Sequence, residues 1–436
     1  MIFLLIFILL INCYYAYNSF KDVASPPVLM GIGMLAASIV SLSYYAEWSM
    51  DKMLPETVLI LGGAPLLFSF CCKRFYIKTF NFDNSFSLDI NLFNTKRLVR
   101  FYAFFVIFAF VILYAKYRIM RSTFTGSFTF SELLFAARMD VYTGDDELDY
   151  PKYITYSSTL SLLVSFYTFW ILSVLIIQKK QAINKLLILL LWFHFFSLVI
   201  NGMLRGDKAS MLDPVFRFIS IFVYVYYMIN KNFKIKKNIL IRIALFFLIL
   251  MLSFRGLSEF IGREVGNHEN NFDMFAEYIG AQIKNFDIYK HGADGHEHTN
   301  VWGIWSFNTL YKQFDDNIKS PELQFQYYNG YSLGNVYTMF YHFDLDFGLI
   351  GVAVMTILIS FVSMVIYNKL FASLTSDCKP NVNLFIYSMI SFPLFMSFFG
   401  PKFLTTVFSL SFIKLIIYII LFSKLFNKYL IYKNEH

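Results

Sequence analysis

Apolar segments long enough to cross a membrane recur along almost the whole chain, separated by short polar loops. A helix needs roughly 20 apolar residues to cross about 30 Å of hydrocarbon at about 1.5 Å per residue. We count about eleven such segments, which predicts an all-α polytopic integral membrane protein. Their approximate bounds are 2–17, 27–47, 55–72, 99–116, 155–177, 186–203, 215–230, 239–254, 347–368, 383–400 and 404–422. The first lacks a basic start, so we interpret it as a retained span and not as a signal peptide.

One long polar stretch, residues 255–346, interrupts this pattern. It holds five of the seven histidines, and six Lys or Arg against thirteen Asp or Glu, a formal −7 against +15 on the rest of the chain. We therefore divide the chain into spans one to eight (1–254), a loop (255–346), and spans nine to eleven with a tail (347–436). Chemistry or recognition is expected beside this loop.

The positive charges indicate the orientation. Lys and Arg gather in one set of alternate loops, between 73 and 97, 179 and 185, 231 and 237, and 369 and 379, and in the tail after 424. Cytoplasmic loops carry such an excess. The long loop is therefore predicted to be extracytoplasmic, with the N-terminus outside and the C-terminus in the cytoplasm. The net charge of +8 follows from this bias, and we expect no nucleic-acid partner.

The long loop carries helical patterns of its own. Five apolar residues recur near helical spacing, namely Phe272, Phe275, Ile279, Ile283 and Phe286, and a second aromatic stretch runs from Trp302 to Phe314. We expect short helices that pack into a cap on the outer membrane surface. A cap of this kind can shelter a cleft.

Five cations are predicted to converge at the outer ends of the spans: Arg205, Lys208, Arg217, Arg255 and Arg263. The first two lie in the run Asn201-Gly-Met-Leu-Arg-Gly-Asp-Lys-Ala-Ser210. Guanidinium and ammonium groups at headgroup level suit a lipid-linked phosphate or pyrophosphate. The alternative is that they contact lipid headgroups or loop carboxylates.

Three further features carry ionisable groups that could take part in chemistry. In the run from His291 to His298, the last two histidines are two residues apart, which does not match a helical zinc motif. We therefore expect no metal. The alternative is a zinc site in which these two histidines lie on one face of an extended strand. His194 falls within a span and is expected to be a hydrogen-bonded interior histidine. Lys414 falls within the last predicted span, where an ionisable group is either functional or snorkels to the interface.

A family resemblance rests on three motifs. Arg205-Gly-Asp-Lys-Ala-Ser210 opens a span, a large outer loop follows the eighth span, and Gly334-Asn-Val-Tyr-Thr338 precedes Asp346-Phe-Gly-Leu-Ile-Gly351. Together they resemble the bacterial O-antigen polymerases, the oligosaccharide repeat-unit polymerases called Wzy. The topology resembles theirs over nearly the whole chain, and the motifs cover about 205–217 and 255–351.

The resemblance implies a membrane glycosyltransferase, similar to the GT-C type, in the bacterial inner membrane. Such an enzyme joins oligosaccharide repeat units linked to undecaprenyl pyrophosphate, at the periplasmic face, in lipopolysaccharide or related polysaccharide biosynthesis. Its expected partners are these lipid-linked glycans, membrane lipids and a chain-length regulator protein, with no cofactor. The alternatives are an O-antigen ligase, which uses the same donor, and a polysaccharide flippase or other transporter.

The implied reaction benefits from a base for the acceptor hydroxyl. Six residues lie on the predicted outer side: Asp207, Glu259, His291, Asp294, His296 and His298. We place His298 first, in the densest polar cluster, together with Glu259, between Arg255 and Arg263, and retain Asp207 as a third candidate.

Overall fold

The computed structural model describes residues 1–77, 94–126, 128–143, 148–178, 184–205, 208–252, 256, 259–260, 271–296, 301–315, 318, 321–374 and 380–428. The chain forms two compact units, each built from segments far apart in sequence. Unit 1 comprises Met1–Phe80, Glu269–Ser373 and Met389–Ile416, and unit 2 comprises Asn81–His268, Leu374–Ser388 and Ile417–His436. The two are described separately below.

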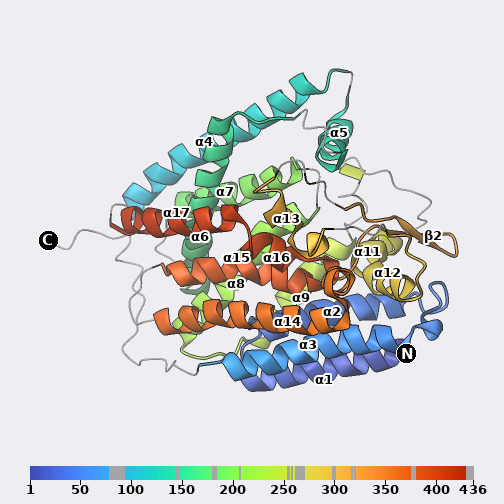
Figure 1. Ribbon diagram of the computed structural model, residues 1–436. Coiled ribbons are helices and arrows are strands. Elements are labelled where there is room, and N and C mark those ends of the chain that lie inside the picture. The colour runs from blue at the N-terminus through green and yellow to red at the C-terminus, as the bar shows by residue number, and fades with distance from the viewer. Residues whose placement is uncertain are drawn as a thin grey trace. The chain divides into compact units, whose positions relative to one another are not determined.

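Unit 1 contains the first helices, the long loop from Glu269 onward and the helix that follows it (Figure 1). Its elements are α1 (Ile2–Phe20), α2 (Pro26–Leu42), η1 (Met50–Lys52), α3 (Pro55–Phe75), α11 (Asn271–Ile279), α12 (Ala281–Lys290), α13 (Ile304–Tyr311), β1 (Gln326–Tyr328), β2 (Tyr331–Gly334), α14 (Met339–Ser373), η3 (Met396–Phe399) and α16 (Lys402–Val407).

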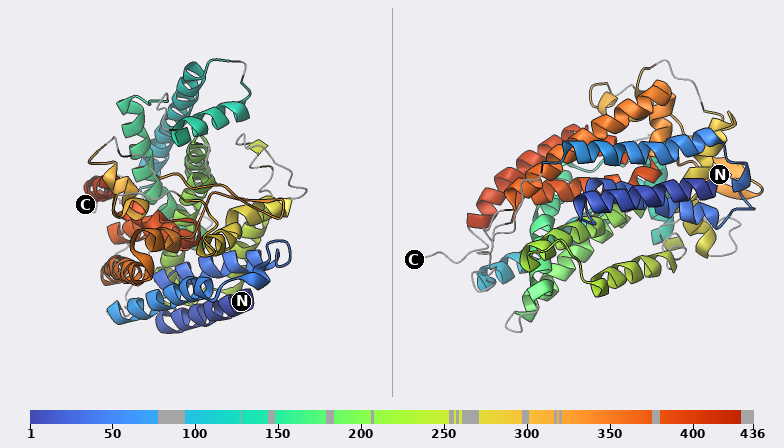
Figure 2. Two further views of the ribbon diagram at one scale, coloured as in Figure 1. Left: turned by 45° about the vertical axis from the view of Figure 1, so that its right-hand side comes forward. Right: turned by 90° about the horizontal axis from the view of Figure 1, so that it is seen from below.

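Unit 2 is built mainly from the middle of the chain, whose long helices Figure 2 shows from two further directions. Its elements are α4 (Thr95–Thr123), α5 (Phe130–Thr143), α6 (Lys152–Gln178), α7 (Lys185–Met203), α8 (Lys208–Asn230) and α9 (Lys237–Leu252). Two helices contribute residues to both units, α15 (Val382–Phe395) and α17 (Leu410–Phe426).

The helices confirm an α-helical polytopic membrane protein. Among the described residues, eight helices are long and apolar enough to cross a membrane: α1, α3, α4, α6, α7, α8, α14 and the stretch Val382–Phe399. The other three predicted spans correspond to α2, α9 and α17, which are shorter, with 17, 16 and 17 residues. The total of eleven spans therefore stays a prediction.

The last predicted span, 404–422, has the wrong start. A short helix, α16, ends at Val407, and α17 begins only at Leu410. Lys414 consequently lies about one turn from the start of α17 and not in mid-span, and it is exposed.

In unit 1, α3 packs against both α1 and α14, and polar contacts join the ends of these helices (Figure 1). The hydroxyl of Tyr367, near the end of α14, donates to buried Asp22, just after α1, at 2.8 Å. The next side chain, Asn368, donates to the carbonyl of Phe75 at the end of α3 at 2.9 Å. The predicted topology places the ends of α1, α3 and α14 on the same side of the membrane, the cytoplasmic side. The grouping agrees with that topology, and the side itself stays a prediction.

The first part of the long loop is helical, as its apolar spacing predicts, but it forms two helices. The break is at Gly280, between α11 and α12, where the carbonyl accepts a hydrogen bond from the Ser41 hydroxyl at 2.6 Å. A Cβ on Gly280 would lie 2.9 Å from the Val40 side chain and 3.0 Å from the Ser41 nitrogen. The glycine therefore permits the close approach of this helix pair to α2.

The return to the membrane is organised by acidic residues and a glycine, as the sequence indicates. Asp346 accepts hydrogen bonds from the backbone nitrogens of Trp305 and Ser306, at 3.2 and 2.7 Å, and so caps the start of α13. A Cβ on Gly348 would meet nothing within 4 Å, so close packing does not require this glycine. Its φ of 65° and ψ of −169° kink α14, a conformation that only glycine adopts readily.

A small hairpin in the long loop was not predicted. Strands β1 and β2 pair antiparallel around Asn329-Gly330, both with positive φ, of 49° and 82°. An Asn-Gly pair between two short strands is a strong hairpin signal, and here aromatic residues surround it. The Asn329 side chain donates to the carbonyl of Glu47 at 2.8 Å, which fixes the hairpin to the segment between α2 and α3.

In unit 2, the buried His194 joins three helices, as expected of an interior histidine. Its ring nitrogens lie 2.7 Å from the Thr168 hydroxyl and 3.3 Å from the Ser161 hydroxyl, both on α6. The Thr168 hydroxyl also reaches Tyr102 on α4, at 3.2 Å. With both nitrogens within reach of hydroxyl groups, the ring is a structural tie between α4, α6 and α7.

Candidate functional site

Four helix ends meet at one end of unit 2. The end of α4, the first half of α5, and the turn from α7 to α8 share one apolar cluster, against which Tyr150, just before α6, also packs. Gly202 makes the turn tight, since a Cβ there would lie 2.3 Å from the Ser210 carbonyl oxygen and 2.9 Å from the Met211 nitrogen. The predicted outer loops that follow α4 and α7 thus lie together.

Lys116 is a buried cation at this end, and the sequence analysis missed it. Only 7% of the residue is exposed. Its ammonium group donates to the Asn201 side chain at 2.8 Å and lies 5.4 Å from the centre of the Tyr150 ring. Both partners are neutral, and within the described part of the chain no carboxylate pairs with Lys116.

Arg205 adds a second positive charge to the first. It is exposed, directly after α7, and its charge acts on both Lys116 and Tyr150. Burial raises the pKa of Tyr150 to about 12, although the charge of Arg205 acts in the opposite direction. The Tyr150 hydroxyl therefore stays protonated at neutral pH, and the ring beside Lys116 is neutral.

Lys208 and Arg217 extend the positive charge along α8. Lys208, the first residue of the helix, is 6% exposed. Arg217, nine residues on, forms an ion pair of 2.6 Å with Asp213 and lies 5.8 Å from the Phe166 ring. One of its terminal nitrogens, Nη1, is buried without a hydrogen-bond partner among the described residues. The guanidinium therefore keeps donor capacity beyond its carboxylate partner.

Glu259 lies at the same end of unit 2. Its neighbour Phe260 packs against Phe130, at the start of α5, with ring centroids 5.6 Å apart, and Glu259 itself is exposed. The four remaining predicted site residues lie outside the described residues, namely Asp207, Arg255, Arg263 and His298. The structure thus brings Arg205, Lys208 and Glu259 to one end of unit 2 and adds Lys116 and Tyr150. These five residues are called the cation site below.

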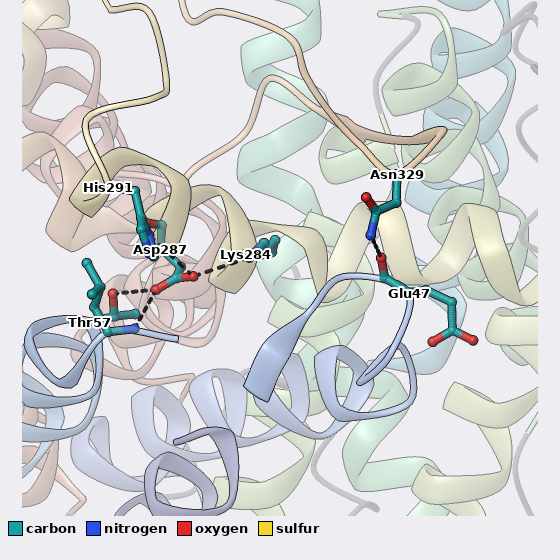
Figure 3. A network of polar contacts seen from close by, with 7 residues as sticks. Glu47, Thr57, Lys284, Asp287, His291 and Asn329 are labelled. Atoms are coloured by element: carbon teal, nitrogen blue, oxygen red, sulfur yellow. Dashed lines mark hydrogen bonds and ion pairs between the residues drawn. The ribbon is translucent and has the colours of Figure 1, made fainter. Parts of the chain in front are cut away.

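The second concentration of charge lies in unit 1, where the long loop meets α3 (Figure 3). The buried carboxylate of Asp287, on α12, accepts from the Leu54 nitrogen and the Thr57 hydroxyl, both at 2.9 Å, at the start of α3. Lys284, also buried, lies 3.3 Å from the same carboxylate. The first turn of a helix leaves backbone N–H groups without partners, and here a carboxylate from another helix satisfies one of them.

A second ion pair fixes the end of α12. Lys290 bridges Asp344 at 2.5 Å and Glu56 at 2.7 Å, and the Tyr289 hydroxyl donates to Asp344 at 2.7 Å. Burial would lower the pKa of Lys290, but hydrogen bonds to the two carboxylates raise it above its ordinary value. Burial and the bond to Asp344 raise the pKa of Tyr289. Lys290 and the Tyr289 hydroxyl therefore keep their protons at neutral pH. Their bonds to Asp344 and Glu56 hold the end of α12 in place.

A third cluster contains a histidine. His296 lies with Nδ1 at 2.8 and 3.0 Å from the two carboxylate oxygens of Asp294, whose side chain is 2% exposed. The Tyr341 hydroxyl donates to the same carboxylate at 3.0 Å, and Gln326, on β1, donates to the Asp294 carbonyl at 2.7 Å. Within the described residues, three or more His, Cys, Asp or Glu side chains nowhere come together in a way that could hold a metal ion.

The sequence carried a partial signal for what was missed. Lys116 is the last residue of the predicted span 99–116, whereas α4 continues to Thr123. A lysine followed by further helical residues would have indicated a buried cation.

Comparisons with protein-family models, with curated proteins and with solved structures found no match to this chain.

Proposed function

We propose that this protein polymerises oligosaccharide repeat units linked to undecaprenyl pyrophosphate, and that the cation site binds the pyrophosphate of the donor. The observation that carries the proposal is the burial of Lys116 beside Arg205, with neutral partners only in the described part of the chain. The expected family resemblance and the predicted outer position of this end add to it.

The physical argument starts from the cost of the arrangement. A buried ammonium group is expensive without an opposite charge, and a second cation nearby raises that cost. A bound pyrophosphate removes the repulsion and accepts hydrogen bonds from Lys116, Arg205 and Lys208. Charge-assisted bonds of this type are among the strongest in proteins. An anion is therefore the ligand that this end of unit 2 fits best.

The position along α4 suits a lipid-linked anion. Lys116 lies 21 residues after the start of the helix at Thr95, or about 32 Å along its axis. The hydrocarbon layer is about 30 Å thick, so a helix that enters it near Thr95 carries Lys116 to the opposite headgroup level. The phosphates of an undecaprenyl carrier lie at that level, with the lipid chain in the membrane.

The chemistry that these cations supply is stabilisation of a leaving group. When the glycan leaves its carrier, negative charge develops on the pyrophosphate, and fixed cations near that charge lower the barrier. The same cations would serve a ligase, which shares the donor. We favour a polymerase on the sequence motifs that end at Ser210 and Gly351.

Chain-length analysis of the surface polysaccharide tests this function. In cells whose own gene is deleted, Lys116→Met and Arg205→Ala should each insert normally but yield single repeat units in place of long chains. Removing one charge-stabilising group typically lowers the rate by about 10²- to 10³-fold. Transfer this slow should not extend the glycan beyond single repeat units. The matched control is Arg121→Ala, an exposed cation at the end of the same helix, bonded to the Tyr117 hydroxyl, which should leave the ladder unchanged.

The alternatives give different results. A ligase would leave full-length chains on the carrier with bare lipid A core, and a flippase would leave repeat units on the cytoplasmic face. Normal ladders from both cation variants, at wild-type protein levels, would contradict the assignment of the cation site.

A further inference from the structure

We infer that Asn201 is a binding residue of the cation site, whose side-chain amide donates a hydrogen bond to the pyrophosphate of the donor while it holds Lys116. The inference rests on the proposed function and adds a residue that the cation site as defined above does not contain. Asn201 lies in the last turn of α7, directly before the close approach at Gly202. Lys116, Tyr150, Asn201 and Arg205 all belong to unit 2.

The bond to Lys116 determines which end of the Asn201 amide faces the ammonium group. An ammonium group has three N–H donors and no acceptor, so its partner at 2.8 Å is the amide oxygen, Oδ1. The oxygen and the nitrogen of an amide diverge, so Nδ2 faces away from the ammonium group. Nδ2 carries two N–H donors, and it has no partner within the described part of the chain. Asn201 is partly exposed, so these donors are open to the surface.

The ammonium group of Lys116 also keeps donor capacity. One of its three donors goes to Asn201, and the neutral Tyr150 ring lies 5.4 Å from it. Among the described residues it has no other hydrogen-bond partner. Donors of Lys116 and of Asn201 are therefore separated by one short hydrogen bond. A phosphate group presents several acceptor oxygens and can accept hydrogen bonds from both side chains.

Arg205 lies one helical turn beyond Asn201. The backbone stays helical past the end of α7, since Leu204 has helical φ and ψ and the Arg205 nitrogen donates to the Gly202 carbonyl at 3.2 Å. Residues four apart on a helix are neighbours on its surface. Asn201 thus contacts one cation directly and lies one turn from the other, whose charge acts on Lys116.

An amide at this position leaves the site open to an anion, whereas a carboxylate would not. Asp differs from Asn by an oxygen in place of the NH2 group. A carboxylate at position 201 would pair with Lys116, as Asp287 pairs with Lys284 in unit 1, and would repel an anion. The amide accepts from the ammonium group without neutralising it and keeps two donors. The site therefore keeps its positive charge and gains a neutral donor for a pyrophosphate oxygen.

Binding of undecaprenyl pyrophosphate to the purified protein in lipid nanodiscs tests this role, with thermal unfolding measured on the same samples. Asn201→Asp loses the donor and adds a negative charge, so it should bind at least about tenfold more weakly than wild type. Its unfolding midpoint should equal or exceed that of wild type, because Lys116 gains an ion pair. Asn201→Leu loses the amide without adding a charge, so its affinity should fall between the two. A purely structural asparagine predicts the reverse order, because Asp is the closer replacement in shape.

The matched control is Asn184→Asp, at the other end of α7, where the exposed asparagine accepts a bond from the Leu186 nitrogen at 2.9 Å. It adds the same charge to the same helix and should leave affinity and unfolding unchanged. Wild-type affinity in Asn201→Asp, or a weaker affinity together with a lower unfolding midpoint, would overturn the role of Asn201. The proposed function would stand if Lys116→Met still bound weakly. Equal affinities of wild type and Lys116→Met would overturn both.

Discussion

The two concentrations of charge in this protein are built in opposite ways. In unit 1, the carboxylates of Asp287 and Asp344 each accept several hydrogen bonds and face a lysine. In unit 2, Lys116 is buried against an amide and an aromatic ring, and the charge of Arg205 acts on it. The first arrangement satisfies its charges internally. The second leaves the charge of Lys116 without an opposite charge among the described residues.

This difference separates groups that hold the fold from groups that bind. Breaking a buried pair leaves a buried charge without its partner, which is strongly destabilising. Removing a buried charge that has only neutral partners relieves a cost instead. Stability measurements on matched variants therefore distinguish the two regions without any assay of function.

The largest loss of stability is expected from Asp287→Ala. It removes the acceptor for Thr57 and for the start of α3, and it leaves Lys284 buried without its ion pair. We expect a loss of about 3–5 kcal/mol, measured by thermal or denaturant unfolding in detergent. The exposed Asp51→Ala should change stability by less than about 0.5 kcal/mol. Equal values for the two variants would contradict a structural role for Asp287.

An intermediate loss is expected from Gly202→Ala, at the turn that forms the cation site. The new Cβ would lie 2.3 Å from the Ser210 backbone, which cannot move aside as a flexible side chain would. We expect about 1–3 kcal/mol and a displaced α7–α8 turn. The control is Gly63→Ala in α3, where a Cβ meets nothing within 4 Å and the better helix former should be neutral or stabilising. A fully stable and active Gly202→Ala would show that the turn tolerates adjustment.

The smallest effect on stability, within about 1 kcal/mol or slightly stabilising, is expected from Lys116→Met. The methionine fills a similar volume without the charge, and the Asn201 amide keeps a partially exposed position. The same variant should abolish long glycan chains, so the residue with the least effect on folding has a large effect on function. A destabilisation comparable to that of Asp287→Ala would place Lys116 among the structural charges.

Hydropathy alone located the helices well, because a span requires a long apolar run whatever it contacts. It placed the ends less well, since α4 passes Lys116 and α17 starts after the α16 helix. Hydropathy fails at Lys116 and Lys414 for the same reason. A charged residue in an apolar run can mark the end of a helix or lie within it, and tertiary contacts determine which.

The candidate site was predictable only in part. Arg205 and Lys208 could be found because cations at predicted outer ends are unusual, and Glu259 because it lies between Arg255 and Arg263. The structure places these three at one end of unit 2. The partners of Lys116 could not, because Asn201 is 85 residues away in sequence. The pairing of Asp294 with His296 depends on a left-handed glycine between them, which the sequence Asp-Gly-His permits but does not require.

The most direct test of the cation site is the affinity of the purified protein for undecaprenyl pyrophosphate in lipid nanodiscs, with and without Lys116. Loss of one charge-assisted bond corresponds to about 1.5–3 kcal/mol, so Lys116→Met should bind at least about tenfold more weakly than wild type. Undecaprenol, which lacks the phosphates, should bind both proteins equally. The same affinity of wild type and Lys116→Met for undecaprenyl pyrophosphate would contradict the account.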